Sequence, residues 1–307
     1  MPVTPWPYPR RSAWIDAQRR TVAAYFKKRN VPVSRDGYIL EDRKAWEGNL
    51  IDPSLKEWLL ELQAERQGAG GAFPIHKWIH HGLSSQALLV NLLGPVLREK
   101  RWEVMDEVLK PADLQLAGKI ARVDLEREDR SVFNERQGQP TSFDLACETD
   151  ANERVFIEFK FTEAEFGGCS VFEEGDCDGA NAATDHSLCY LHHLGRRYWN
   201  AMDRHGLTAT VRADATCPFA FLYQAYRELL FALECGGKYV LVHDARNTAF
   251  VSPGPHRVRG LWSRLLSTLP ADVRAMTSTL TIQRVADDLE RLGCAWIAQL
   301  REKHDLR

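Results

Sequence analysis

Three charged residues stand close together in one short segment of the chain and could act as a chemical group. The segment "FDLACETDANERVFIEFKFTE", residues 143–163, alternates apolar and polar residues on either side of a polar turn. Because successive side chains of a strand point to opposite faces, this alternation predicts two paired β-strands. Asp144 lies on the first predicted strand, and Glu158 and Lys160 share one face of the second.

The apolar residues of the two strands predict their register. On the first strand the predicted apolar face consists of Phe143, Leu145 and Cys147. The pairing that keeps apolar beside apolar sets Asp144 opposite Glu158 or Lys160. Directly opposed residues have Cβ atoms roughly 4.5–5.5 Å apart, so two carboxylates placed there repel each other. We therefore expect a cation beside this acidic pair.

The residue types indicate which cation and which reaction. Carboxylate oxygens suit Mg²⁺ or Mn²⁺, which commonly takes one or two carboxylates and completes its shell with waters and phosphate oxygens. Lys160 would then lie beside the water that attacks a phosphate. In the alternative interpretation, Lys160 merely neutralises Glu158 on the exposed face of a hairpin. The apolar run "VFIEFKF" favours function, since charges on an interior strand are costly unless they are used.

The spacing of these residues resembles a known signature. Asp144, a spacer of 13 residues and then Glu158-Phe159-Lys160 resemble the Asp, Glu-x-Lys pattern of the PD-(D/E)XK nuclease superfamily, which has the restriction-endonuclease-like fold. The segments "FDLACETD…VFIEFKFTEAEFG" and "CPF…LYQAYRELL" are similar, more particularly, to a little-characterised bacterial group of that superfamily. The resemblance covers roughly residues 140–230.

The resemblance implies a role for each residue of the signature. Asp144 and Glu158 would bind Mg²⁺ or Mn²⁺, with the backbone carbonyl of Phe159 as a further ligand. Lys160 would orient or deprotonate the attacking water, or stabilise the charged transition state. The implied activity is that of a Mg²⁺-dependent deoxyribonuclease, with DNA as partner and a 5′-phosphate and a 3′-hydroxyl as products.

Positions outside the signature add to this comparison. Ser142-Phe143 replaces a proline that often precedes the aspartate, and Gln86 stands where many members have a glutamate, which leaves a second metal open. On the predicted helix at 218–235, Gln224 stands where such nucleases often place a residue that contacts the phosphate or the attacking water. Arg227, one turn away, suits a phosphate contact, or else pairs with Glu228 on the surface.

The segment from 163 to 216 is rich in glycine, cysteine, aspartate and histidine. Its cysteines, with the one that follows it, are Cys169, Cys177, Cys189 and Cys217. The tight C-x-x-C pairs typical of structural zinc or iron–sulfur sites are absent, so independent thiols are one interpretation. The other is a Zn²⁺ ion or an iron–sulfur cluster that staples the segment, as in some nucleases of the superfamily.

A basic and aromatic stretch follows within the same segment. "SLCYLHHLGRRYWNAM", residues 187–202, predicts one helix that combines positive charge with aromatic rings. Arg196 and Arg197 on this helix are our candidates for contacts with DNA. The alternative is a solvated basic face with Tyr198 or Trp199 buried beneath it.

The elements around this segment predict a mixed α/β fold, with a central sheet flanked by helices. The resemblance implies a restriction-endonuclease-like core. The breaker "GAGGAFP" at 68–74 divides an N-terminal helical extension, 1–70, from a nuclease domain, 71–307. The remaining predicted helices are 12–30, 54–67 and 83–102, and the predicted strands are 116–128, 142–149, 154–161, 238–245 and one in the last strand-helix unit, 278–303.

Composition bounds the function only loosely. The 307 residues carry a net charge of −2, so no overall field attracts nucleic acid, and a polyanion must be met by local basic patches. Nothing at the N-terminus resembles a secretory signal and no apolar stretch could span a membrane, so we expect a cytoplasmic protein without a membrane partner. Cutting two DNA strands would need two active sites, which favours a homodimer. The rival functions are a catalytically inactive nucleic-acid-binding module of the same fold and an unrelated α/β scaffold.

Overall fold

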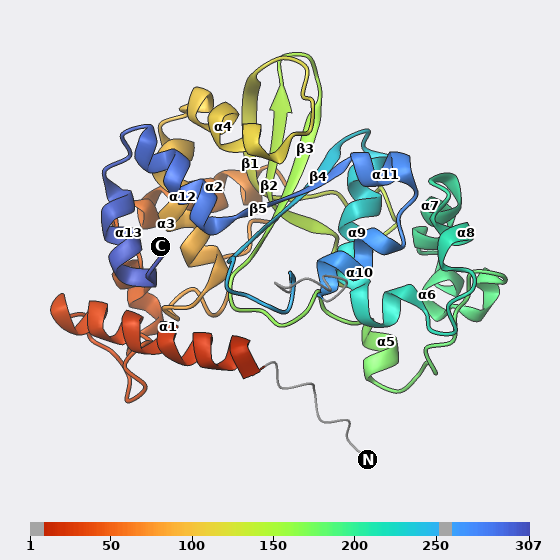
Figure 1. Cartoon of the computed structure of the whole chain (residues 1–307), viewed down its shortest axis with the longest axis horizontal. Helices are drawn as coiled ribbons and strands as arrows, with labels where there is room; N and C mark the ends of the chain where they lie inside the picture. Colours follow the sequence, from red (N-terminus) through yellow and green to blue (C-terminus); the bar gives the residue numbers. More distant parts are fainter. Residues whose placement is uncertain (1–8, 252–259) are drawn as a thin grey trace.

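A five-stranded sheet forms the centre of the molecule in the computed structural model, which describes residues 9–251 and 260–307 (Figure 1). The strands lie in the order β1-β2-β3-β4-β5. β1 to β3 are antiparallel, and β3, β4 and β5 are parallel, so the predicted mixed sheet is confirmed. The strand bounds are Ile120–Glu128, Ser142–Thr149, Arg154–Lys160, Lys238–His243 and Thr277–Thr281.

The central strand β3 is buried on both faces. Val155, Ile157 and Phe159 belong to the core on one side of the sheet, and Phe156 belongs to the core on the other. A strand covered on both faces reads as a nearly continuous apolar run, which is the pattern of "VFIEFKF". Only Glu158 and Lys160 interrupt this run, and they are 5% and 6% exposed. The prediction that these charges lie on an interior strand is therefore confirmed.

Helices cover both faces of the sheet (Figure 1). The first face carries α2 (Leu55–Gly68), α3 (Ser85–Arg98), α4 (Trp102–Leu109), α12 (Ile282–Arg291) and α13 (Trp296–His304). α1 (Pro9–Lys28) packs against α13. The second face carries α7 (Tyr198–Arg204), α8 (Leu207–Val211), α9 (Pro218–Glu234), α10 (Leu261–Ser267) and α11 (Ala271–Ala275). No helix in the described ranges is long and apolar enough to cross a membrane.

The N-terminal helices share the core of the sheet. Leu55 and Leu59 of α2 are buried in the same cluster as Val155 and Ile157 of β3. Within the stretch predicted as an extension, 1–70, the described residues form α1 and α2 with turns and a short 3-10 helix between them, and α2 packs directly on the sheet. The boundary at residue 70 stays a prediction, and residues 1–8, at the start of the stretch that lacks a secretory pattern, lie outside the described residues.

Two predicted helices are each divided in the structure. The single helix predicted for 187–202 is wrong: α6 (Tyr190–His193) and α7 are separated at Gly195, whose φ of 82° ends the first helix. The last predicted helix likewise divides into α12 and α13 at Gly293, with φ of 79°. In both places a glycine in the left-handed region ends a helical pattern that the apolar spacing alone would continue.

Candidate active site

The registers of the first three strands place three carboxylate-bearing residues at one level of the sheet. Leu145 of β2 pairs with Leu125 of β1 and with Ile157 of β3. The next position along each strand towards the same end of the sheet is occupied by Glu126, Asp144 and Glu158. The predicted opposition of Asp144 and Glu158 therefore follows from the observed register, and Glu126 extends the row onto a third strand.

β2 and β3 separate at Asp144. The last paired residues of the two strands are Leu145 and Ile157, and beyond them Oδ2 of Asp144 accepts a hydrogen bond of 2.7 Å from the backbone N–H of Phe159. The carboxylate thus replaces a backbone carbonyl as the acceptor. The predicted face of Phe143 is wrong: its ring packs on Phe156, with ring centroids 4.8 Å apart, in the core on the other side of the sheet from Leu145 and Cys147.

Glu126 is a site residue that the sequence analysis missed. Its φ of 49° is uncommon for a residue with a side chain and marks a local departure from strand geometry. Its Oε1 accepts a hydrogen bond of 2.7 Å from Gln86 of α3, whose own Oε1 accepts from the N–H of His76 at 2.8 Å. Only its position in the strand could have identified Glu126, and that position comes opposite Asp144 only once the register of β1 against β2 is known.

Lys160, Glu158 and Gln224 form a closed hydrogen-bonded triangle. The Lys160 amine lies 2.8 Å from Oε1 of Glu158 and donates to Oε1 of Gln224 at 2.9 Å. Gln224 Nε2 donates to the same Glu158 oxygen at 2.8 Å. The structure therefore brings the predicted residues of β3 and α9 together, while their catalytic roles stay predictions.

A further carboxylate lies on α9 one turn after Gln224. Glu228 is 1% exposed and accepts a hydrogen bond of 2.8 Å from the hydroxyl of Tyr239 on β4. It is not the partner of Arg227 that the sequence suggested. Arg227 instead pairs at 2.9 Å with Glu135, which is also 1% exposed. The surface Arg–Glu pair is therefore corrected to a buried one that involves a different glutamate.

The acidic residues shift the pKa values of one another. Burial raises the pKa of Asp144 well above its usual range, and the charges of Glu158 and Glu126 raise it further. Burial also raises the pKa of Glu126 to about 7, where Glu158 adds to the rise and Gln86 opposes it. Because neighbouring acids disfavour each other's charge, the site favours either bound protons or a bound cation.

The same surroundings favour the charged form of Lys160, whereas they disfavour the charged form of the acids. Burial opposes its charged form, but attraction to Glu158, Glu163 and Glu228 outweighs this and raises the pKa of Lys160 above its ordinary value. The side chain therefore stays protonated at neutral pH. In this arrangement it is suited to donate hydrogen bonds and positive charge rather than to accept a proton.

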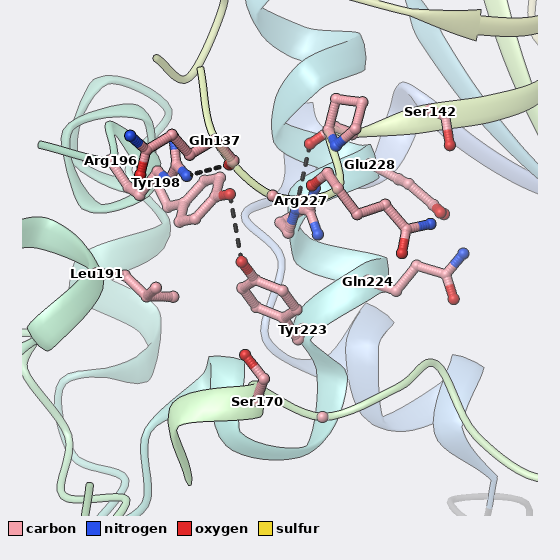
Figure 2. Close-up of a pocket in the computed structure, with 15 residues that line it drawn as sticks. Gln137, Ser142, Ser170, Leu191, Arg196, Tyr198, Tyr223, Gln224, Arg227 and Glu228 are labelled. Carbon is pink, nitrogen blue, oxygen red and sulfur yellow. Dashed lines mark hydrogen bonds between the residues drawn. The ribbon is translucent and has the colours of Figure 1, made fainter. Parts of the chain in front are cut away.

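A polar pocket of about 420 Å³ opens beside this group. Figure 2 shows Tyr223, Gln224, Arg227 and Glu228 of α9 lining it, with Tyr198 of α7 on its other side. The hydroxyl groups of Tyr223 and Tyr198 lie 3.3 Å apart, and the Arg227 guanidinium lies over the ring of Tyr223. The pocket combines aromatic faces with hydrogen-bond donors next to Gln224.

The predicted nucleic-acid contacts differ in their freedom to bind. Arg196 lines the pocket and donates to the backbone carbonyls of Asn134 and Gln137, the second at 2.6 Å. Arg197 is exposed at the start of α7. Arg227 is held by Glu135 and by the carbonyl of Gln139. Their contacts with DNA stay predictions.

The four predicted metal-binding cysteines are free thiols. Cys169 is buried, and Cys177, Cys189 and Cys217 are half-buried. Within residues 9–251 and 260–307, no three His, Cys, Asp or Glu side chains are arranged to hold a single metal ion. The prediction of a metal at these cysteines therefore stays a prediction.

Comparison with known proteins gives one family. The model of the family described as "Restriction Endonuclease associating with ARP" matches residues 19–304, which include every strand and all the residues of the site. Neither the curated proteins nor the solved structures compared with the chain gave a match. Since the match spans most of the 307 residues, the chain belongs to this restriction-endonuclease family.

Proposed function

We propose that this protein is a metal-dependent nuclease of the PD-(D/E)XK type that hydrolyses DNA phosphodiester bonds. The observation that carries the proposal is the row formed by Glu126, Asp144 and Glu158 on three adjacent strands, with Lys160 hydrogen-bonded to Glu158. Membership of a restriction-endonuclease family supports the same reaction class. DNA as the substrate follows from that family and is part of the proposal.

The donor set fits Mg²⁺ or Mn²⁺. Carboxylate oxygens are hard ligands, and the burial and mutual repulsion that raise the pKa values of Asp144 and Glu126 would both be offset by a bound divalent ion. Asp144 and Glu158 would hold the ion, together with the carbonyl of Phe159, and Glu126 lies in the same row as further negative charge rather than as a third ligand. When bound, the ion would polarise the scissile phosphate and lower the pKa of water.

The protein's own residues would position the reaction. Lys160 would donate to a phosphate oxygen and stabilise the charge that develops in the transition state, since its raised pKa keeps it protonated. Gln224 orients this lysine by accepting from its amine, and it also fixes the Glu158 carboxylate by donating to it. Gln86 holds Glu126 from the opposite face of the sheet.

A cleavage assay tests this proposal. Supercoiled plasmid, linear duplex and single-stranded DNA would be incubated with the protein in Mg²⁺, Mn²⁺ or EDTA. We expect cleavage with the metals and none in EDTA. Glu158→Gln and Lys160→Met should each lower the rate by about 10²-fold or more, since each removes a group positioned at the reacting phosphate.

Lys238→Met is the matched control. Lys238 is also a strand lysine in an ion pair, 3.2 Å from Glu153, but it pairs with Val155 at the far end of β3 from Lys160. It should retain the cleavage rate, and thermal melting should show that all three variants are folded. DNA binding without cleavage under any metal would support the inactive binding module instead. Loss of both binding and cleavage in the wild type would refute a role on DNA.

A further inference from the structure

A second polar pocket opens among the helices of the first face of the sheet. Its volume is about 460 Å³, within the range of roughly 300–1,000 Å³ that is usual for ligand sites. Its walls come from α1, from the segment between α1 and α3, and from the residues that follow β3. We call it the Trp78 pocket, and the lining residues that bear on its function are Arg19, Tyr38, His76, Trp78, His81 and Thr162.

The Trp78 pocket adjoins the row of acids in the candidate active site. Thr162 and Glu163, which line it, follow shortly after the end of β3. The hydroxyl of Ser85, another lining residue, donates to Glu163 at 2.5 Å. The next residue, Gln86, donates to Glu126 at 2.7 Å. A ligand in this pocket would therefore lie beside the carboxylates on the sheet.

The pocket contains an aromatic ring that the core does not use. Trp78 is 45% exposed, whereas every other tryptophan in residues 9–251 and 260–307 is buried or half-buried. The ring of His81 lies next to it, with ring centroids 4.9 Å apart. Because the indole is a large apolar surface, its exposure inside a pocket indicates a surface that binds a ligand.

Positive charge accompanies the aromatic rings. The Arg43 guanidinium and the Lys77 amine lie 5.9 and 5.3 Å from the centre of the Trp78 ring. Arg19 lies over the ring of Tyr38 at 5.4 Å. Single-stranded nucleic acid is bound by this combination, since cations meet the phosphates and bases stack on the rings. The pocket therefore supplies a local basic patch, which a chain with a net charge of −2 needs to meet a polyanion.

The segment that carries the indole is held in place by backbone contacts. The N–H of Leu40 donates to the carbonyl of His80 at 3.1 Å, and the N–H of Gly82 donates to the carbonyl of Tyr38 at 2.8 Å. The side-chain amide of Asn49 donates to two further carbonyls of the same segment, both at 2.7 Å. A ring on a fixed segment loses little conformational entropy when a ligand binds.

We propose that the Trp78 pocket binds an unpaired base of the DNA strand that is cleaved. The position of this base next to the scissile phosphate rests on the proposed nuclease function. A base within a duplex is stacked on its neighbours, so it reaches Trp78 only where the strand is unpaired. The base would replace the exposed Lys77 amine over the indole, and that amine would then meet a phosphate.

The proposal names both a substrate class and a role for the N-terminal region. The substrate would be single-stranded DNA or a strand that is unpaired beside the cleaved bond. Since Arg19 and Tyr38 precede the predicted boundary at residue 70, the N-terminal region would contribute to substrate choice.

Binding measurements on the full chain test the pocket without cleavage. Fluorescence anisotropy would follow a labelled single strand and the matching duplex in Ca²⁺, which takes hard oxygen ligands as Mg²⁺ does. The wild type should prefer the single strand. Trp78→Ala should weaken that binding by about 10-fold or more, as expected for one lost stacked base, while Trp78→Phe keeps a ring and should retain most of the affinity. Arg19→Met should reduce the salt dependence by about one charge.

Phe221→Ala is the matched control. Phe221 is also an exposed aromatic residue, at 59%, but it lies on α9 and packs on Phe172 of α5 (Ser170–Glu173), with ring centroids 5.4 Å apart. It should bind DNA as the wild type does, and far-UV circular dichroism would show that the variants are folded. The proposal is overturned if Trp78→Ala keeps the wild-type affinity or if the wild type prefers the duplex. An exposed Trp78 would then suit a protein partner instead.

Steady-state cleavage of the single strand in Mg²⁺ separates this proposal from the nuclease function. Trp78→Ala should raise KM and leave kcat unchanged, because the base contact is the same in the ground state and the transition state. Cleavage with an unchanged KM in Trp78→Ala would refute the base pocket and leave the nuclease. A wild type that binds through Trp78 but never cleaves would refute the nuclease and leave the base pocket.

Discussion

Glu126 is a single residue whose charge makes the site sensitive to pH near neutrality. Glu126 has an unusual φ of 49°, its carboxylate accepts a hydrogen bond from Gln86, and the charge of Glu158 acts on it. Burial and the charge of Glu158 raise its pKa to about 7. Near neutral pH this residue therefore changes charge over the range in which a divalent ion competes with protons.

The same shift predicts how stability depends on pH in the absence of metal. The native pKa of Glu126 is about 7 and the unfolded value is about 4.3, so the native state binds more protons between these values. Stability from this group is thus present below pH 4.3 and lost as pH rises through 7. Glu126→Gln should reduce the fall in melting temperature between pH 5 and pH 7.5, measured by calorimetry in EDTA.

Glu128→Gln provides the control for this measurement. Glu128 lies on the same strand but is half-buried and pairs with Arg130, at 3.7 Å, instead of joining the acidic row. It should leave the pH dependence of the melting temperature unchanged. Equal pH slopes in the wild type and Glu126→Gln would show that Glu126 is already ionised in the native protein.

The residue types at the centre of the site were predictable, whereas their surroundings were not. Asp144, Glu158 and Lys160 stand on short alternating strands joined by a local turn, so sequence spacing fixes their approach. Glu126 meets them through the pairing of β1 with β2, across a connection that holds no periodic pattern. Its left-handed backbone also breaks the alternation on which a prediction would rely.

At the scale of elements, α9 links the site to the loop before β2. Arg227 pairs with Glu135, and Glu135 also accepts hydrogen bonds from Tyr198 at 2.5 Å and from the N–H of Thr141 at 2.6 Å. This network connects α9 and α7 with the loop that leads into β2. It holds the helix carrying Gln224 at a fixed distance from the strand that carries Asp144.

Removing one partner of this buried pair should destabilise the protein strongly. Arg227→Met leaves Glu135 buried without its cation, so we expect the free energy of unfolding to fall by about 3–5 kcal/mol. Urea denaturation followed by circular dichroism would measure the change. Arg197→Met, at an exposed position, should alter stability by less than about 0.5 kcal/mol.

The same two variants separate structure from recognition. If Arg197 contacts a phosphate, Arg197→Met should weaken DNA binding and reduce the salt dependence of the affinity by about one charge. An unchanged free energy of unfolding in Arg227→Met would show that the pair with Glu135 adds nothing. In that case Arg227 would be available as the phosphate contact that its sequence position suggests.

The helices were predicted best where one apolar pattern was unbroken. α9 begins at Pro218 and ends at Glu234, close to the predicted range of 218–235. The prediction failed at 187–202, since Gly195 takes a left-handed conformation that the spacing of apolar residues does not reveal. The segment around that glycine is arranged by the contact of Tyr198 with Tyr223 of α9 and by hydrogen bonds with the loop before β2, which are distant in sequence.

At the scale of the whole molecule, the C-terminal helix fastens the N-terminal region to the core. Lys303 of α13 is 1% exposed and donates to the backbone carbonyl of Asn49 and, at 2.6 Å, to its side-chain oxygen. Asn49 in turn donates to the carbonyls of Ile79 and His81, both at 2.7 Å. Lys303 thus joins α13, through one buried amine, to the region around Asn49, Ile79 and His81.

This amine predicts a second, opposite pH dependence of stability. Burial, with a smaller effect from Arg29, lowers the pKa of Lys303 to about 7, while the unfolded value is about 10.4. The unfolded state therefore binds more protons between these values, so stability is fully present above pH 10.4 and is lost as pH falls through 7. The wild type should gain up to about 1.4 kcal/mol per pH unit from this group between pH 7 and pH 9. Lys303→Met should remove that part of the gain, as measured by urea denaturation at pH 7, 8 and 9.

Lys28→Met is the control that removes an exposed lysine instead of a buried one. Lys28, on α1, pairs with Glu302 at the surface, so it contacts the same helix α13 without being desolvated. Because the Lys28 side chain is exposed in the folded protein, the control should keep the wild-type slope. If Lys303→Met also kept that slope, the native amine would have to be charged at pH 7. The contacts with Asn49 would then stabilise a full positive charge, and the link between α13 and Asn49 would be insensitive to pH between 7 and 9.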